Sequence, residues 1–158
     1  MGAPALWATR AMNEVYRELE HPADLWLEIR GDDPESLSEH ALYALYASMV
    51  HLERVRPLEE RTLQAQAGHL AGALRRLLAE ALYLFDAEGY VAGAATVGLS
   101  AGEPGGPGAV ALEARVWGEV FDPCRHERLS EIKAVTYHQL SAGPATEGGW
   151  RATVLLDV

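Results

Sequence analysis

The spacing of hydrophobic residues predicts two helices. In residues 32–50, apolar side chains recur at steps of three and four, at Leu37, Ala41, Ala44, Leu45 and Met49. In residues 69–86 the same steps define a broader stripe, made of Leu70, Leu74, Leu77, Leu78, Ala81 and Phe85. Each pattern gives a helix one apolar face, which must be buried against another part of the protein.

Local signals mark the ends of these helices. Asp33 is placed to cap the first helix, Pro34 takes its first position, and Glu35 adds a negative charge to its first turn. These residue types in this order are typical of a helix start. Gly89 follows the second helix and suits the left-handed turn that ends many helices.

The other apolar stretches are typical of β-strands. We predict strands over residues 14–20, 25–31, 61–67, 90–100, 108–120, 131–140 and 150–158. Glycine-rich links at 101–108 and 141–149 are expected to be turns between strands. Strands grouped around two helices predict an α+β fold, with a largely antiparallel β-sheet packed with two main helices. We expect a loose N-terminal leader at 1–13 and a single domain at 14–158.

Residues 131–140 mix polar and apolar side chains on both faces of their expected strand. Because side chains alternate in an extended chain, one face would carry Ile132, Ala134, Thr136 and His138. The opposite face would carry Lys133, Val135, Tyr137 and Gln139. Neither face is wholly apolar or wholly polar, so packing alone does not account for the pattern.

Composition and charge narrow the classes of function. The 158 residues are 49% apolar and include 13 basic and 23 acidic side chains, for a net charge of −10. Binding to a phosphate backbone relies on Lys and Arg replacing counterions, so this balance argues against a direct grip on nucleic acid. It favours a cation or a basic protein surface as the partner.

The same sequence bears on location. Cys124 is the single cysteine, so an internal disulfide is excluded and a reducing compartment, the cytoplasm, is expected. No apolar run approaches the roughly 20 residues that a membrane span needs. Residues 1–13 lack the basic start and long apolar run of a signal peptide.

Familiar catalytic motifs are absent from the sequence. It has neither a phosphate-binding loop ending in Lys and Ser or Thr, nor a G-x-S-x-G motif. Residues 102–108 are glycine-rich but contain no Lys and precede no helix pattern, so phosphate binding is not expected there. Cys124 and His126 allow a Cys/His dyad, although this spacing favours an unreactive thiol.

Carboxylates stand at the ends of two predicted strands. Asp24 immediately precedes the strand at 25–31, and Asp157 is followed only by Val158 with its terminal carboxylate. Adjacent anions repel one another unless a cation or a basic group joins them. If Asp24 meets this pair, three carboxylates form a hard oxygen site suited to Ca²⁺, Mg²⁺ or Mn²⁺. The alternatives are a local turn at Asp24 and a frayed, solvated C-terminus.

Several motifs, taken in order, resemble those of the archease family. They are His-Pro-Ala-Asp at 21–24, the helical stretch 77–89, Gly118-Glu119 with His126 downstream, Ile-Lys-Ala-Val-Thr-Tyr-His at 132–138, and Leu-Leu-Asp-Val at 155–158. The resemblance covers Glu14 to Val158. Two departures stand out: archeases commonly have Thr where this chain has Pro22, and many have an acidic residue where Gly68 and His69 stand.

The resemblance implies a function. Archeases are cofactor proteins of the RNA ligase RtcB, which joins tRNA halves and other broken RNAs with GTP and Mn²⁺. They assist formation of the ligase–guanylate intermediate, permit repeated turnover and broaden nucleotide use. This chain is accordingly expected to be a non-enzymatic ligase activator in tRNA splicing and RNA repair.

The resemblance also implies site residues. A metal site of the Ca²⁺ type carries over onto Asp24, Asp157 and Val158, with Mn²⁺ or Mg²⁺ as other ions. Lys133, Tyr137, His138 and Glu119 become candidates for a surface that contacts the ligase, or else for a structural hydrogen-bond network. The alternative function is a stand-alone metal-dependent hydrolase or nuclease that uses Asp24, Asp157 and His138.

Overall fold

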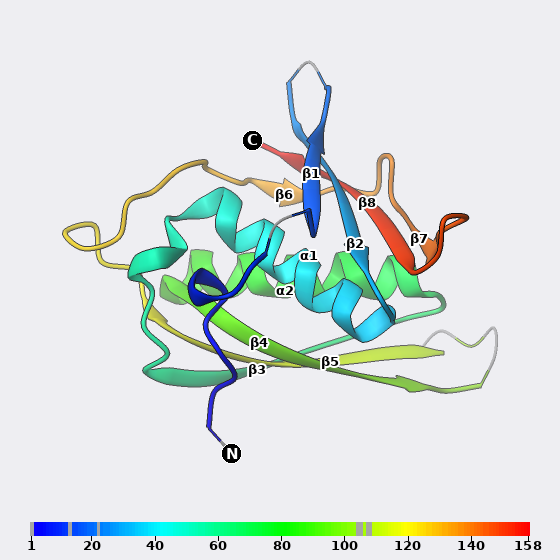
Figure 1. Ribbon diagram of the computed structural model, residues 1–158, viewed down its shortest axis with the longest axis horizontal. Coiled ribbons are helices and arrows are strands. Elements are labelled where there is room, and N and C mark those ends of the chain that lie inside the picture. The colour runs from blue at the N-terminus through cyan, green and yellow to red at the C-terminus, as the bar shows by residue number, and fades with distance from the viewer. Residues whose placement is uncertain (1, 13, 22, 104–105, 107–108) are drawn as a thin grey trace.

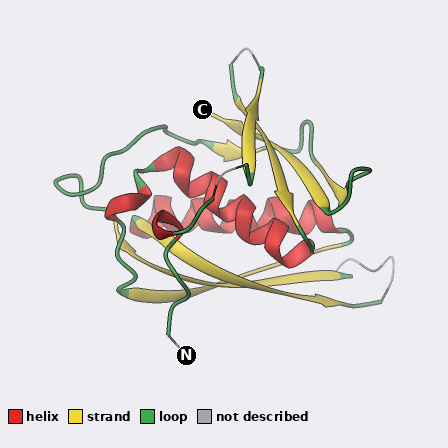
Figure 2. Ribbon diagram, in the orientation of Figure 1, coloured by secondary structure: helices red, strands yellow, loops and turns green. Residues whose placement is uncertain are grey.

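Two helices lie between two antiparallel sheets (Figures 1 and 2). The computed structural model describes residues 2–12, 14–21, 23–103, 106 and 109–158, so part of the predicted loop at 101–108 lies outside the described residues. The helices are α1 (Pro34–Met49) and α2 (Leu70–Glu88). This arrangement confirms the predicted α+β fold with two main helices, although its strands divide between two sheets.

The larger sheet is built around the C-terminal strand. Its strands are β1 (Tyr16–Leu19), β2 (Leu25–Gly31), β6 (Ala134–Val135), β7 (Ser141–Pro144) and β8 (Trp150–Asp157). Strand β2 pairs with one edge of β8, while β6 and β7 share the other edge. The smaller sheet has β5 (Val110–Val120) between β3 (Glu59–Ala67) and β4 (Tyr90–Ala101).

The helix boundaries follow the predicted signals. The side chain of Asp33 accepts a hydrogen bond from the Ser36 amide at 2.7 Å, and the Ser36 hydroxyl accepts one in return from the Asp33 amide. Gly89 ends α2 with φ 72°, in the left-handed region. Residues on both predicted apolar faces are buried in the core, which lies between the helices and the two sheets.

The N-terminal segment is not a loose leader, contrary to expectation. Trp7 begins a short 3₁₀ helix (Trp7–Thr9) and is only 1% exposed. Its ring packs against Tyr43 and Tyr46 of α1, and its indole N–H donates to Glu39 at 2.9 Å. Met12 is also buried in the core. The folded unit therefore begins before residue 14.

The predicted strand at 131–140 is wrong. Within it only Ala134 and Val135 form β6, and Tyr137–Gln139 form a turn in which Gln139 has φ 55°. The chain then returns to the edge of β8 as β7, where a turn was expected. The mixed pattern arises because Ile132 and Val135 point into the core while a turn follows them, so period-two alternation does not apply.

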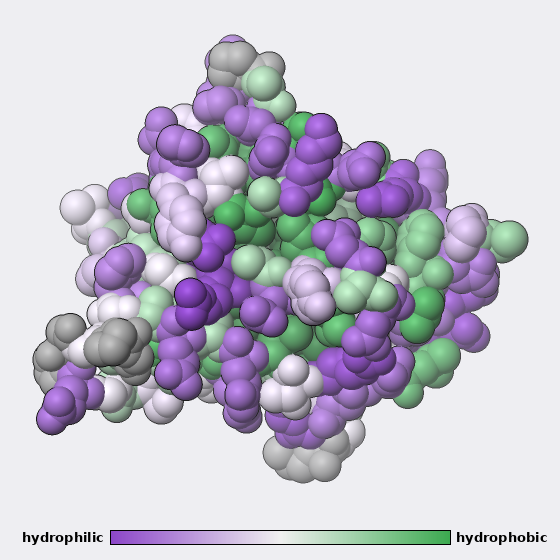
Figure 3. Space-filling model, turned by 180° about the vertical axis from the view of Figure 1, so that it is seen from behind, coloured by the Kyte–Doolittle hydropathy of each residue, from purple (hydrophilic) through white to green (hydrophobic). Residues whose placement is uncertain are grey.

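The outer surface is mostly polar. Figure 3 shows the side of the molecule opposite to Figure 1, where hydrophilic side chains cover much of the surface and apolar atoms appear near its centre. In the described ranges, no helix combines the length and apolar character needed to cross a membrane.

Candidate functional site

Asp24 and Asp157 come together at one end of the five-stranded sheet. Leu25 of β2 pairs with Leu156 of β8, so Asp24 and Asp157 occupy the next opposed position. Opposed residues in an antiparallel pair direct their side chains to the same face of the sheet. The C-terminus lies beside the β1–β2 hairpin in Figure 1. The register therefore places Asp24 opposite Asp157 along the backbone, and their joint binding of a cation stays a prediction.

Asp24 has a histidine, His21, as its neighbour. Its Oδ2 lies 3.8 Å from Nδ1 of His21, and both side chains are partly exposed. This His21 nitrogen is itself buried and has no hydrogen-bond partner among the described residues. The His21 ring meets Trp26 edge-on, with centroids 6.4 Å apart. At this end of the sheet, Nδ1 of His21 therefore remains without a hydrogen-bond partner among the described residues.

The donor set determines how a metal ion would fit. In the part of the chain that the structure describes, no group of three His, Cys, Asp or Glu side chains is placed to hold an ion. The predicted donor set has two carboxylate side chains, those of Asp24 and Asp157, and takes its third donor from the carboxylate of Val158. The oxygen chemistry of the three predicted carboxylates fits a hard cation.

Lys133, Tyr137 and His138 lie beside this end of β8. The amide of Lys133 donates to the carbonyl of Asp157 at 2.7 Å, and the amide of Thr136 donates to the carbonyl of Leu155 at 3.0 Å. The side chain of Lys133 is exposed, as are Tyr137 and His138 in the following turn; Tyr137 is 69% exposed. Three of the four predicted surface residues are therefore exposed, and the backbone of one of them, Lys133, is bonded directly to Asp157.

Arg75 of α2 contacts this turn through both its guanidinium face and a hydrogen bond, a role that the sequence analysis did not predict. Its guanidinium carbon lies 3.9 Å from the centroid of the Tyr137 ring, and Nη1 donates to the carbonyl of Val135 at 3.1 Å. The Nε atom is buried and has no hydrogen-bond partner among the described residues. No local signal identifies Arg75, because its role depends on the later segment crossing α2.

Glu119 is in the interior, apart from the exposed residues with which it was grouped. It is 6% exposed and lies near the end of β5. Its carboxylate accepts hydrogen bonds from the Arg56 amide at 2.8 Å, from the Arg56 and Arg125 guanidinium groups and from Nε2 of His126 at 3.1 Å. This environment matches the structural network that the sequence left as an alternative.

The charge state of Glu119 follows from these contacts. Burial alone would raise the pKa of its carboxyl group, but hydrogen bonds from Arg125, Arg56 and His126 outweigh it and lower the pKa to about 2. His126 is also fixed, since its Nδ1 accepts from the amide of Asp122 at 2.8 Å. Both ring nitrogens are thus engaged, and the exposed Cys124 has no dyad partner in His126.

Gly118 explains the Gly-Glu motif. A Cβ atom at this position would lie 1.8 Å from the carbonyl oxygen of Val91 on the neighbouring strand. Only glycine permits this approach between β4 and β5, which positions the following Glu119 over the loop that carries His126.

Comparison with known proteins now adds to this geometry. The family model described as the Archease protein family (MTH1598/TM1083) matches residues 16–158. The chain belongs to the archease family. Protein archease from Pyrococcus furiosus is 31% identical over 143 residues, covering 90% of this chain and 98% of the relative. Protein archease from Methanosarcina mazei is 34% identical over 148 residues, covering 94% and 99%.

Two solved structures resemble this archease. The solution structure of Methanobacterium thermoautotrophicum protein 1598 has a TM-score of 0.78 and 26% identity, covering 91% of this chain and 99% of that one. A crystal structure from Thermotoga maritima, described as an archease and possible chaperone, has a TM-score of 0.57 and 19% identity, covering 90% and 96%. The second likeness supports the fold alone.

The structure also accounts for one departure of this archease from its family pattern. His69, where many archeases were expected to have an acidic residue, caps α2: its Nδ1 accepts a hydrogen bond from the Gly72 amide at 3.1 Å. An imidazole nitrogen thus accepts the helix-capping hydrogen bond that a carboxylate would otherwise accept. The other departure, Pro22, lies outside the described residues.

Proposed function

We propose that this archease activates an RNA ligase of the RtcB type. In this role it promotes formation of the ligase–guanylate intermediate, permits repeated turnover and broadens the range of nucleotides that the ligase accepts. Membership of the archease family over residues 16–158 supports the proposal. The observation that carries it is that the exposed Lys133 is bonded through its amide to Asp157 at the sheet end and is followed by an exposed turn with Tyr137 and His138.

In this proposal the protein is a non-catalytic cofactor of the ligase. It acts in the cytoplasm, in tRNA splicing and RNA repair. The alternative is a stand-alone hydrolase or nuclease that uses Asp24, Asp157 and His138. Catalysis of that kind needs a metal with an open position and a base within hydrogen-bond reach. The exposed turn that carries His138 favours contact with a partner protein instead, because it displays Tyr137 and His138 side by side.

A cation held by Asp24, Asp157 and the Val158 carboxylate belongs to the same proposal. Ca²⁺ is the preferred ion, with Mn²⁺ or Mg²⁺ as alternatives, because all three donors are hard oxygens. Such an ion offsets the repulsion between the neighbouring carboxylates of Asp157 and Val158. The carbonyl of Asp157 also accepts a hydrogen bond from the Lys133 amide. An ion that fixes Asp157 would therefore also help to fix the exposed segment that begins at Lys133.

The decisive experiment measures guanylation of a purified RtcB-type ligase with and without this protein. We expect substoichiometric amounts of the protein to raise the guanylation rate and to convert single turnover into multiple turnover. The protein alone should neither hydrolyse GTP nor join RNA. A ligase rate that does not change with the cognate protein, at low and at physiological salt, would refute the proposed function.

A C-terminal extension tests the cation site without changing any side chain. Adding a tag after Val158 replaces the terminal carboxylate with an amide, so cation-dependent stabilisation should disappear. In the untagged protein that stabilisation is about 2.7 kcal/mol at a hundredfold excess of ion over Kd. Thermal melts with Ca²⁺ or Mn²⁺ measure it, and the same tag at the exposed N-terminal side, before Gly2, is the control. A C-terminally tagged protein that still gains stability from the ion would remove Val158 from the site.

A further inference from the structure

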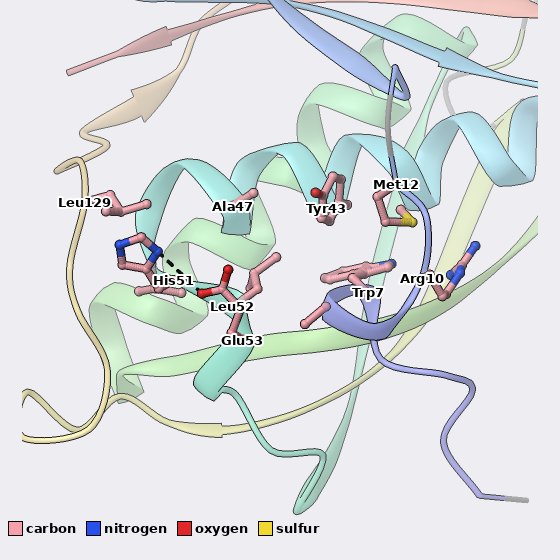
Figure 4. A pocket seen from close by; sticks show the side chains of 11 residues that line it. Trp7, Arg10, Met12, Tyr43, Ala47, His51, Leu52, Glu53 and Leu129 are labelled. Atoms are coloured by element: carbon pink, nitrogen blue, oxygen red, sulfur yellow. Dashed lines mark ion pairs between the residues drawn. The ribbon is translucent and has the colours of Figure 1, made fainter.

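The N-terminal segment, α1 and residues 50–53 line a pocket at the surface (Figure 4). Its volume is about 260 Å³. We call it the N-terminal pocket; its apolar lining is formed mainly by Trp7, Met12, Tyr43, Ala47, Leu52 and Leu129. The family model begins at residue 16, so Trp7 and Met12 belong to a part of the chain outside the family match.

Acidic side chains in and around this pocket outnumber its single arginine. Figure 4 shows the Glu53 carboxylate on the pocket side of His51, to which it is joined by an ion pair of 3.7 Å. His51 meets a second carboxylate, that of Glu127, at 3.3 Å. The one arginine of the lining, Arg10, is already paired with Glu39 at 2.6 Å. Negative charge therefore exceeds positive charge around the pocket.

Tyr43 adds an aromatic wall and a hydroxyl group. Its ring lies edge-on to Trp7, with centroids 5.6 Å apart, so the pocket has a rigid aromatic side. Burial and then the negative charge of Glu53 raise the pKa of the Tyr43 hydroxyl, which keeps that group protonated and neutral. A cation placed between Glu53 and Tyr43 meets a carboxylate on one side and an aromatic ring on the other.

Size and chemistry together select the occupant. Pockets for small molecules usually measure about 300–1,000 Å³, so this smaller cavity suits a single anchoring side chain. A half-buried aromatic ring beside one carboxylate matches a side chain that has an apolar stem and a positive head. A guanidinium group is planar, can bind a carboxylate through two hydrogen bonds and stacks on aromatic rings, which a lysine ammonium does less well.

We propose that the N-terminal pocket binds an arginine side chain presented by a partner protein. The guanidinium group lies at the Glu53 carboxylate, and the methylene stem packs against Tyr43 and Ala47, which are half-buried. Arginine is among the residues that most often anchor protein interfaces, and an acidic protein favours a basic partner surface. The inference does not depend on the proposed ligase activity.

Titration with a blocked Gly-Gly-Arg-Gly-Gly peptide, followed by ¹⁵N NMR, tests this assignment. We expect saturable shifts at the Trp7 indole N–H and at the amides of Ala47 and Glu53. The matched peptide with citrulline has nearly the same shape but no charge, and it should bind at least tenfold more weakly. The peptide with lysine should also bind more weakly, because an ammonium group lacks the planar arrangement of N–H donors that a guanidinium group has.

Two variants separate the pocket from general surface charge. Glu53→Gln should weaken binding of the arginine peptide at least tenfold, whereas Glu127→Gln should leave it nearly unchanged. Both carboxylates contact His51 and are similarly exposed, at 77% and 73% of their side chains, so both variants should fold normally. The assignment fails if no shift saturates, if the citrulline or lysine peptide binds as tightly as arginine, or if both variants lose binding equally.

Discussion

The buried carboxylate of Glu119 should contribute strongly to stability at neutral pH. Its pKa is lowered from 4.5 to about 2, and each unit of such a shift corresponds to about 1.4 kcal/mol. The difference of about 2.5 units therefore corresponds to about 3–4 kcal/mol. Glu119→Gln keeps the shape of the side chain but removes the charge, which leaves the guanidinium groups of Arg56 and Arg125 without their anion. We expect the variant to lose about 2–4 kcal/mol of unfolding free energy near pH 7.

The pH dependence identifies the cause of that loss. Because the folded-state pKa is depressed, the stabilisation is fully present above the unfolded value of 4.5 and is lost as pH falls towards about 2. The gap between wild type and Glu119→Gln should therefore narrow over this range. Urea unfolding at several pH values measures it directly.

A matched variant on the same strand controls for the loss of any glutamate. Glu113 of β5 is exposed and its carboxylate accepts a hydrogen bond from Gln64 at 2.9 Å. Glu113→Gln should change stability by less than about 0.5 kcal/mol, as is usual for surface positions. A Glu119→Gln cost below about 1 kcal/mol, or one independent of pH, would show that the ion-pair network does not stabilise the fold.

Further substitutions test other parts of the structure. Trp7→Ala should cost about 3–5 kcal/mol in denaturant unfolding, because it empties a core position, whereas deleting a side chain from a loose leader would cost nothing. Arg75→Ala should speed hydrogen exchange at residues 135–139 and reduce ligase activation, while the neighbouring Arg76→Ala, an equal change of charge at an exposed position, should do neither. Lys133→Ala and His138→Ala should impair activation more than they lower the melting temperature; parallel losses of both would make these residues structural.

Helix positions could be predicted from sequence because their signals are local. The apolar steps, the Asp33 cap and the Gly89 turn each act within a few residues, and the structure has all three. The predicted strands at 25–31 and 150–158 also allowed Asp24 and Asp157 to be placed at strand ends. Their opposition depends on the register of β2 and β8, which the sequence did not specify.

Features that depend on distant partners were missed or misassigned. Trp7 is buried because its ring packs against Tyr43 and Tyr46 of α1. No pattern within residues 1–13 predicts this contact. The segment 131–140 has strand composition, yet β8 accepts it only at Ala134 and Val135 before the chain turns. Glu119 was grouped with surface residues because the motif gives its neighbours in sequence but not its burial.

The loop from Glu119 to Lys133 links the buried network to the exposed site. It leaves β5 of the smaller sheet, and the hydrogen bonds of Glu119 with Arg125 and His126 fix its first part. Its middle is then held along the end of α1, where the amides of Leu129 and Ser130 donate to the carbonyls of Met49 and Ser48 at 2.8 and 3.1 Å. It ends where the Lys133 amide meets Asp157.

This path gives a physical reason for two motifs of the chain to act together. The segment 121–133 has almost no regular structure, so its course depends on anchors at both ends rather than on a strand or a helix. Loss of the anchor at Glu119 should release the first part of the loop, up to the contacts that Leu129 and Ser130 make with α1. The buried Gly-Glu motif therefore fixes the start of the segment whose other end meets Asp157 at Lys133.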